Sequence, residues 1–127
     1  MYKFLLNSIK NVHENVLMYR IELNKNDLIQ LLDQSNGYNN FDPIKIKEFV
    51  EKVDKKFHEL YKDRFFSIRF IFGREYSPVL YIKVNTINGD LKSFINSVNQ
   101  LKRKIDCDEF NIIEDFYGNC EIRIWWD

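Results

Sequence analysis

The sequence predicts an α+β fold, a two-layer sandwich in which a mostly antiparallel sheet of about five strands has helices packed on one face. Two observations lead to this prediction. Two segments place apolar residues at helical spacing, and each is followed by two short strand-like runs separated by turn residues. Residues 43–126 therefore have the order helix–hairpin–helix–hairpin. At 127 residues we expect a single domain, residues 1–127, that buries a core without disulfides.

Two amphipathic segments are the expected main helices. Within residues 42–63, Asp42 is placed as the N-cap and Pro43 as the first helical residue. Within residues 89–107, Asp90 takes the capping position. The apolar stripes that recur every three or four positions consist of Ile46, Phe49, Val50, Val53, Phe57 and Leu60 in the first segment, and of Leu91, Phe94, Ile95, Val98, Leu101 and Ile105 in the second.

Three other features complete the prediction of the helical segments, and the last two of them leave alternatives. A shorter helix is expected after Asn26 as its cap. Residues 2–12 fit either a helix, which we favour, or an edge strand. Residues 47–54 and 92–99 share a K-x-F pattern 45 positions apart. This similarity is explained either by an internal repeat or, as we favour, by the common demands of two amphipathic helices.

Five runs rich in branched and aromatic residues are the expected strands. They are residues 16–23, 65–72, 79–84, 110–116 and 120–126. The turn "GREYSP" (73–78) is longer than a tight hairpin needs, so Arg74, Glu75 and Tyr76 are expected to be exposed at its tip. Because loop tips often carry contacts, Arg74 and Tyr76 are candidate binding residues.

Alternation along these strands assigns side chains to the two faces of the sheet. In the last strand Ile122, Ile124 and Trp126 are expected to face the helices, whereas Trp125 faces away. The open face would then carry Met18, Arg20, Glu22, Arg69, Tyr81, Lys83, Glu121, Arg123 and Trp125. From this set we select Arg69, Tyr81, Lys83, Arg123 and Trp125 as candidate binding residues of the open sheet face.

Composition limits the kinds of partner. The 19 basic and 19 acidic side chains cancel, which argues against a dominant attraction to nucleic acid or to an anionic membrane. No apolar run approaches the ~20 residues of a membrane span, and the first residues lack the pattern of a signal peptide.

We expect Cys107 and Cys120 to be reduced thiols in a cytoplasmic protein. The absence of alanine and the abundance of Asn, Lys and Ile are typical of a low-GC genome, such as that of a microbe or its phage.

Catalytic and cofactor signatures are not found in the sequence. No phosphate-binding loop, zinc-protease motif or nucleophile elbow occurs, and we expect no metal and no cofactor. Residues 106–127 carry seven acidic side chains and one basic side chain, Arg123. This final hairpin is either a solvated edge that resists strand pairing, which we favour, or a docking surface for a basic partner.

The sequence therefore favours a small non-enzymatic binding protein over an enzyme. We expect it to bind a protein partner, or a second copy of itself, through the open sheet face, with no membrane involved. An inhibitor of a host system, encoded by a phage or mobile element, is the favoured context. The first alternative is a single-stranded nucleic-acid-binding protein that stacks bases on the aromatic residues of this face. The second is a small enzyme whose acidic site is not visible in the sequence.

Overall fold

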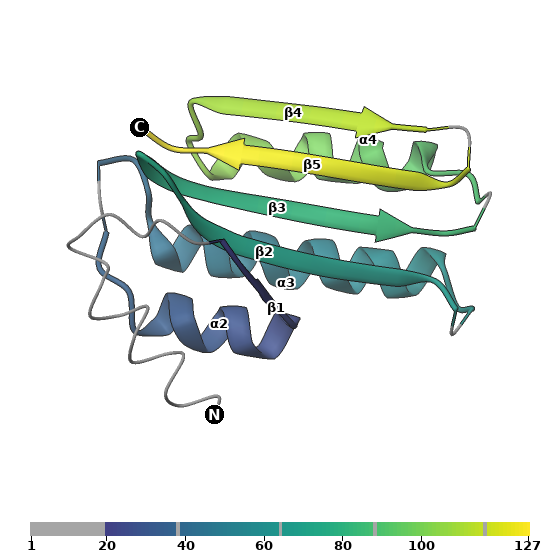
Figure 1. The fold of residues 1–127 in the computed structure, drawn as a ribbon, viewed down its shortest axis with the longest axis horizontal. Helices are drawn as coiled ribbons and strands as arrows, with labels where there is room; N and C mark the ends of the chain where they lie inside the picture. Colours follow the sequence, from purple (N-terminus) through teal and green to yellow (C-terminus); the bar gives the residue numbers. More distant parts are fainter. Residues whose placement is uncertain (1–19, 38, 64, 88, 116) are drawn as a thin grey trace.

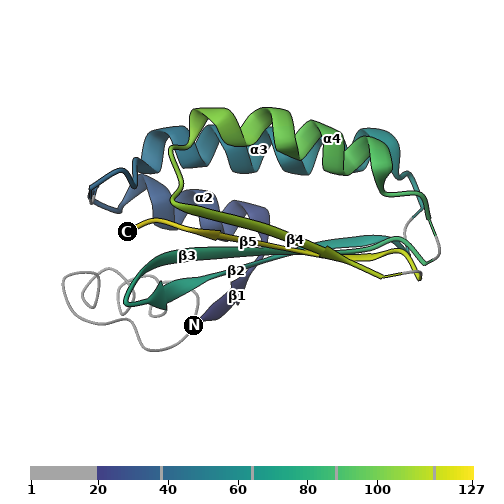
Figure 2. The same cartoon turned by 90° about the horizontal axis from the view of Figure 1, so that it is seen from above.

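The predicted two-layer α+β architecture is confirmed by a computed structural model. It describes residues 20–127 with the exception of residues 38, 64, 88 and 116. Its five antiparallel strands form one sheet with the order β1-β2-β3-β5-β4. The helices α2, α3 and α4 all pack on the same face of this sheet (Figures 1 and 2). The predictions for residues 2–12 and for Met18 lie outside the described residues.

The short helix α2 (Lys25–Asp33) begins earlier than expected. Its N-cap is Asn24, whose side-chain oxygen accepts a hydrogen bond from the amide of Asp27 at 2.8 Å, so the prediction of Asn26 as the cap is wrong. The helix begins here because strand β1 ends at Leu23, and Asn24 supplies the first acceptor for the free amides.

Helix α3 begins where the sequence places its cap, whereas helix α4 begins one residue later than predicted. Helix α3 (Pro43–Leu60) has Asp42 as its N-cap, which accepts the amide of Ile44 at 3.0 Å. The N-cap of helix α4 (Lys92–Leu101) is Leu91, which makes no side-chain capping bond, so the prediction of Asp90 as the cap is wrong by one residue. The Asp90 carboxylate nevertheless accepts the amide of Lys92 at 2.9 Å. The final turn predicted for this helix is instead a 3-10 helix, η1 (Lys102–Lys104).

The strands are β1 (Ile21–Leu23), β2 (Ser67–Glu75), β3 (Ser77–Asn85), β4 (Glu109–Glu114) and β5 (Asn119–Trp125). Strands β2 and β3 extend further than expected, and Tyr76 alone separates them. The predicted loop over residues 73–78 is therefore wrong. Tyr76 closes the turn in the left-handed conformation (φ 66°) and is 94% exposed. Arg74 lies within β2, opposite Pro78, and is half-buried. Strand β3 can include Pro78 because a strand tolerates proline near its beginning.

The core lies between the sheet and the helices. Ile122, Ile124 and Trp126 are fully buried, as their alternation predicts. The indole of Trp126 packs edge-on against Phe41, with ring centroids 5.2 Å apart, and donates a hydrogen bond to the carbonyl of Ile105 at 2.7 Å. Among the described residues, no helix combines the length and the apolar character that crossing a membrane requires.

Candidate functional site

The strand register brings the five predicted residues of the open sheet face together. Arg69 lies opposite Lys83, and Tyr81 lies opposite Arg123 in the neighbouring row. Trp125 pairs with Val79 one row further along. Because side chains two positions apart point to the same side, all five lie on the face opposite the helices, the lower side of the sheet in Figure 2.

Glu75 is the centre of a hydrogen-bond network at one end of this face. Its carboxylate accepts from Arg123 Nε at 2.9 Å, from the Tyr81 hydroxyl at 3.1 Å and from Arg20 Nη1 at 3.3 Å. Arg123 also donates through Nη1 to Glu109 at 2.6 Å. Sequence reasoning misses Glu75 as a site residue because it assigns this position to a loop. Glu75 lies an even number of residues after Arg69 in the same strand, so both side chains point to the same face of the sheet. This spacing is the signal that could have identified Glu75.

The guanidinium of Arg123 is held in its charged form by this network. Burial opposes the charge, but the hydrogen bonds to Glu109 and Glu75 outweigh burial and raise the pKa of Arg123 above its ordinary value. Arg123 is the best-buried cation of the open face, with 26% of its side chain exposed. It therefore acts as a fixed cross-strand tie between β5, β4 and the end of β2.

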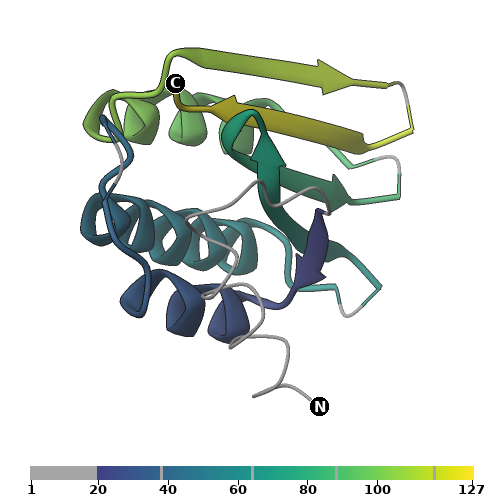
Figure 3. The same cartoon turned by 60° about the vertical axis from the view of Figure 1, so that its left-hand side comes forward.

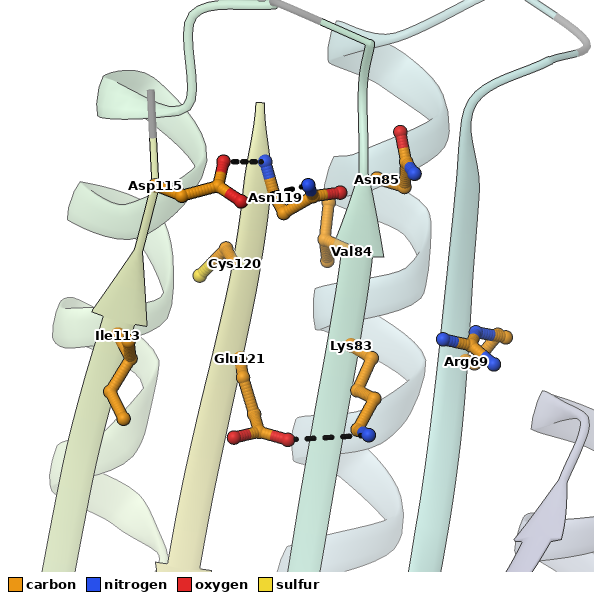
Figure 4. Close-up of a pocket in the computed structure, with 9 residues that line it drawn as sticks. All are labelled: Arg69, Lys83, Val84, Asn85, Ile113, Asp115, Asn119, Cys120 and Glu121. Atoms are coloured by element: carbon orange, nitrogen blue, oxygen red, sulfur yellow. Dashed lines mark hydrogen bonds and ion pairs between the residues drawn. The ribbon is translucent and has the colours of Figure 1, made fainter. Parts of the chain in front are cut away.

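The other two candidate cations are also paired with carboxylates. Arg69 Nη1 lies 2.9 Å from Glu22 Oε1, which joins β2 to β1. Lys83 Nζ lies 3.4 Å from Glu121 Oε1, which joins β3 to β5 (Figure 4). Both pairs are more exposed than the Arg123 network. The cations of the open sheet face therefore lie beside acidic side chains rather than forming a continuous positive surface.

The two candidate aromatic residues of this face, Tyr81 and Trp125, are held in place by contacts with polar groups. The guanidinium of Arg20 lies 5.5 Å from the ring centroid of Tyr81, so it covers one face of that ring. The indole nitrogen of Trp125 donates to the carbonyl of Glu75 at 2.8 Å. To reach β2 from β5, this indole crosses β3 at Val79, which is fully buried although it faces away from the helices.

A shallow hollow lies at the other end of the face, and the Lys83–Glu121 pair forms part of its lining. Its volume is about 330 Å³. Ile113, Asp115 and Asn119 form one side of it (Figure 4). The Asn119 side-chain amide donates to the Asp115 carboxylate at 2.8 Å, and this bond, together with the amides of Asn119 and Tyr117, lowers the pKa of Asp115.

Cys120 also borders the hollow, but its thiol is not activated. Burial, followed by the nearby charges of Glu114 and Glu121, raises the pKa of Cys120 to about 12. Burial likewise raises the pKa of Cys107. Since the thiolate is the nucleophilic form, neither cysteine has the environment of a catalytic thiol.

The predicted loop residues do not join this site as a pair. Arg74 is half-buried within β2, whereas Tyr76 projects from the turn. Within the described part of the chain, no three His, Cys, Asp or Glu side chains gather as a metal site would require. Comparison with protein-family models, with curated proteins and with solved structures finds no match to this chain.

Proposed function

We propose that this protein is a non-enzymatic binding protein whose partner is another protein, contacted through the open sheet face. The observation that carries the proposal is the pairing of the candidate cations. Arg69, Lys83 and Arg123 each lie within 3.4 Å of a carboxylate oxygen of the same face. A surface that carries fixed charges of both signs suits a protein partner, because a protein can place acidic groups opposite its cations and basic groups opposite its carboxylates.

The same pairing weighs against single-stranded nucleic acid as the partner. A phosphate would have to displace Glu22, Glu121 or Glu75 from its cation, or bind beside that carboxylate. Bases also need an open aromatic ring on which to stack, and Arg20 covers one face of Tyr81. Both observations support a protein partner over single-stranded nucleic acid.

The immobilised aromatic residues favour a protein interface. Tyr, Trp and Arg are the residue types that most often anchor protein–protein contacts. Tyr81 and Trp125 are already fixed by Glu75, so binding loses little side-chain entropy. A cytoplasmic inhibitor of a host system, encoded by a phage or mobile element of a low-GC genome, is the context we propose for such an interface.

The test begins with affinity capture from the cells that carry the protein, with the partner identified by mass spectrometry. We expect the association to survive nuclease treatment. With purified components, the dissociation constant should rise by less than about tenfold between low and moderate salt. A phosphate-driven complex would lose about 10³–10⁵ in affinity over such a range, and that result would contradict the proposal.

A matched pair of variants locates the contact. Lys83→Glu reverses a charge on the open face, whereas Lys55→Glu makes the same change at an exposed position of α3. We expect Lys83→Glu to weaken binding and Lys55→Glu to leave it unchanged. Equal effects would mean that the partner does not use the open face. Analytical ultracentrifugation of the purified protein decides whether a second copy of the chain is the partner.

A further inference from the structure

Strand β4 forms one edge of the sheet. In the strand order β1-β2-β3-β5-β4 it pairs, among the described strands, with β5 alone. It is the outermost strand in Figure 1 and the yellow-green arrow at the top of Figure 3. At the other edge β1 has three residues, whereas β4 has six. An edge strand presents unpaired backbone groups to which a strand of another chain can bond, and β4 presents the longer row.

The hydrogen-bond pattern shows which backbone groups of β4 point away from the sheet. The amide of Asp115 donates to the carbonyl of Asn119 at 3.0 Å. Because bonded and non-bonded pairs alternate along an antiparallel ladder, this bond assigns the odd-numbered residues of β4 to the pairs that are bonded to β5. The outward N–H and C=O groups are therefore those of Phe110, Ile112 and Glu114. Among the described residues, none of these groups has a hydrogen-bond partner.

Several features that commonly protect an edge strand from pairing are missing from β4. Proline, lysine and β-bulges are such features. Residues 109–114 contain neither proline nor lysine, and their register with β5 continues through the whole strand without a bulge. Ile113 is 66% exposed. The protection that β4 does have is the acidic charge at its two ends, so this charge decides which strand can pair with it.

Acidic residues flank the centre of β4 on both sides. In "DEFNIIED" (108–115), Asp108 and Glu109 precede a mainly apolar centre, and Glu114 and Asp115 follow it. All four acidic residues are exposed. A second copy of β4, aligned in either direction, would place acidic side chains opposite acidic ones at both ends, which is destabilising. A strand with lysine or arginine at both ends would instead place a cation opposite each pair of carboxylates.

Cations within the described part of the chain offset this charge at one end only. Arg123 donates to Glu109 at 2.6 Å. The Nζ of Lys102 lies 4.6 Å from the centroid of an aromatic ring at the same end of β4. At the other end, Glu114 makes no ion pair with a described residue, and the hydrogen bonds that lower the pKa of Asp115 keep that carboxylate charged. A basic partner strand therefore meets negative charge that the chain itself does not neutralise.

We propose that β4 is a docking edge for a protein partner, which adds to the sheet a strand that carries lysine or arginine at both ends of a short apolar segment. The inference rests on the proposed protein-binding function, but it assigns the contact to the backbone of the sheet edge. Main-chain hydrogen bonds supply the affinity, and the charges supply the specificity. Because Ile113 lies opposite Glu121 and lines the hollow of the open sheet face, a strand added to β4 extends that face.

The test uses two short peptides with the same centre of alternating valine and threonine. The basic peptide has two lysines at each end, and the acidic peptide has two glutamates at each end. At ten times its dissociation constant, the basic peptide should slow hydrogen exchange of the outward amides of Phe110, Ile112 and Glu114 by about tenfold. The amides of Asn111 and Ile113 should change little, because β5 already protects them. The acidic peptide should bind about tenfold more weakly or less.

Two variants separate the backbone of β4 from its charge. Ile112→Pro removes an outward N–H at an edge position, where a strand accepts proline, and should abolish binding of the basic peptide. Glu114→Lys should lower the affinity for the basic peptide by about fivefold and raise the affinity for the acidic peptide. Glu51→Lys is the matched control, because it makes the same change at an exposed position of α3, away from β4 (Figure 1). It should leave both affinities unchanged.

Thermal unfolding checks that each variant is folded. Ile112 packs partly against the core, whereas Glu114 is exposed, so Glu114→Lys tests the inference even if Ile112→Pro does not fold.

Other outcomes would overturn the inference. One is equal affinity for the two peptides, or binding of neither. Another is slowed exchange confined to residues outside β4. A third is a dimer of the protein in analytical ultracentrifugation that Ile112→Pro abolishes, which would assign the edge to a second copy.

The captured partner separates this inference from the proposed function. A protein partner whose binding is weakened by Lys83→Glu but unaffected by Glu114→Lys and Ile112→Pro would remove the β4 edge from the contact and leave the proposed function standing. A partner that is lost on nuclease treatment would overturn both.

Discussion

Trp125 and Trp126 are neighbours in the chain but lie on opposite faces of the sheet. Both indole nitrogens donate to a backbone carbonyl, Trp126 to Ile105 at 2.7 Å and Trp125 to Glu75 at 2.8 Å. Their burial differs, since Trp126 is fully buried and Trp125 only half-buried. Both tryptophans make a hydrogen bond but only one is fully buried. Comparing them therefore separates the contribution of hydrophobic burial to the fold from that of the hydrogen bond.

The same contrast extends over the two faces as a whole. The face under the helices is held by apolar contact among buried residues such as Ile82, Ile122 and Ile124. The open face is held by ion pairs and hydrogen bonds that centre on Glu75. Since partly exposed ion pairs contribute little free energy, we expect the stability of the fold to come mainly from the covered face.

The largest effect is expected from Trp126→Ala. Emptying a fully buried aromatic site costs about 3–5 kcal/mol, and here a buried hydrogen bond to Ile105 is lost as well. Urea unfolding followed by circular dichroism measures the change in the free energy of unfolding. Trp126→Phe is the control, which should recover part of the loss. A cost below about 1 kcal/mol would mean that the end of β5 does not support the core.

A second large effect is expected at alkaline pH. The pKa of Cys120 is raised to about 12 in the folded protein, against 9.0 in an unfolded chain. The folded state therefore holds a proton that the unfolded state releases, so this contribution is complete below pH 9 and is lost as the pH rises towards 12. The free energy of unfolding should fall over this window, and less steeply in Cys120→Ala. Equal slopes for both proteins would show that Cys120 is not buried as a thiol.

Sequence periodicity is sufficient to predict the layers and the faces. The apolar stripe of α3 and the alternation of β5 follow from the geometry of helices and strands, so the pattern by itself assigns Phe57 and Trp126 to the core, where both are buried. The same alternation places Arg69, Tyr81 and Arg123 on one face, which the register confirms.

The parts that could not be predicted depend on unusual backbone conformations. The β2–β3 turn closes at Tyr76, and the loop after β3 turns at Ile87, both with positive φ. Neither residue type signals such a turn, for which glycine or asparagine is expected. Glu75 is for this reason assigned to a loop by its sequence context, and its hydrogen-bond network is missed.

On the open face, the largest expected effect is that of Trp125→Ala. Loss of a half-buried indole and of its bond to Glu75 should cost about 2 kcal/mol, roughly half the cost at Trp126. The variant should also expose Val79 to solvent. The same urea titration checks this, with Trp125→Phe separating ring packing from the hydrogen bond. A cost equal to that of Trp126→Ala would mean that both faces of the sheet are cores.

Glu75→Gln tests the network itself. The amide keeps the shape of the carboxylate but removes its charge and replaces one of its two acceptor oxygens by an NH2 donor, so it cannot accept from Arg123, Tyr81 and Arg20 together. Because the group is partly exposed and water can replace these bonds, we expect a loss of about 1 kcal/mol. The loss should shrink in high salt. No change at any ionic strength would indicate that the network forms without stabilising the fold.

The smallest effects are expected from Arg69→Ala and Lys83→Ala. Each residue makes a single ion pair with an exposed or partly exposed carboxylate, that of Glu22 or Glu121, and such pairs contribute roughly 0.5 kcal/mol or less. Thermal unfolding at two salt concentrations measures the change. If both variants retain full stability while Lys83→Ala weakens partner binding, the open face is under selection for binding rather than for folding. If either variant costs as much as Glu75→Gln, its ion pair belongs to the framework of the sheet in the same way as the Glu75 network.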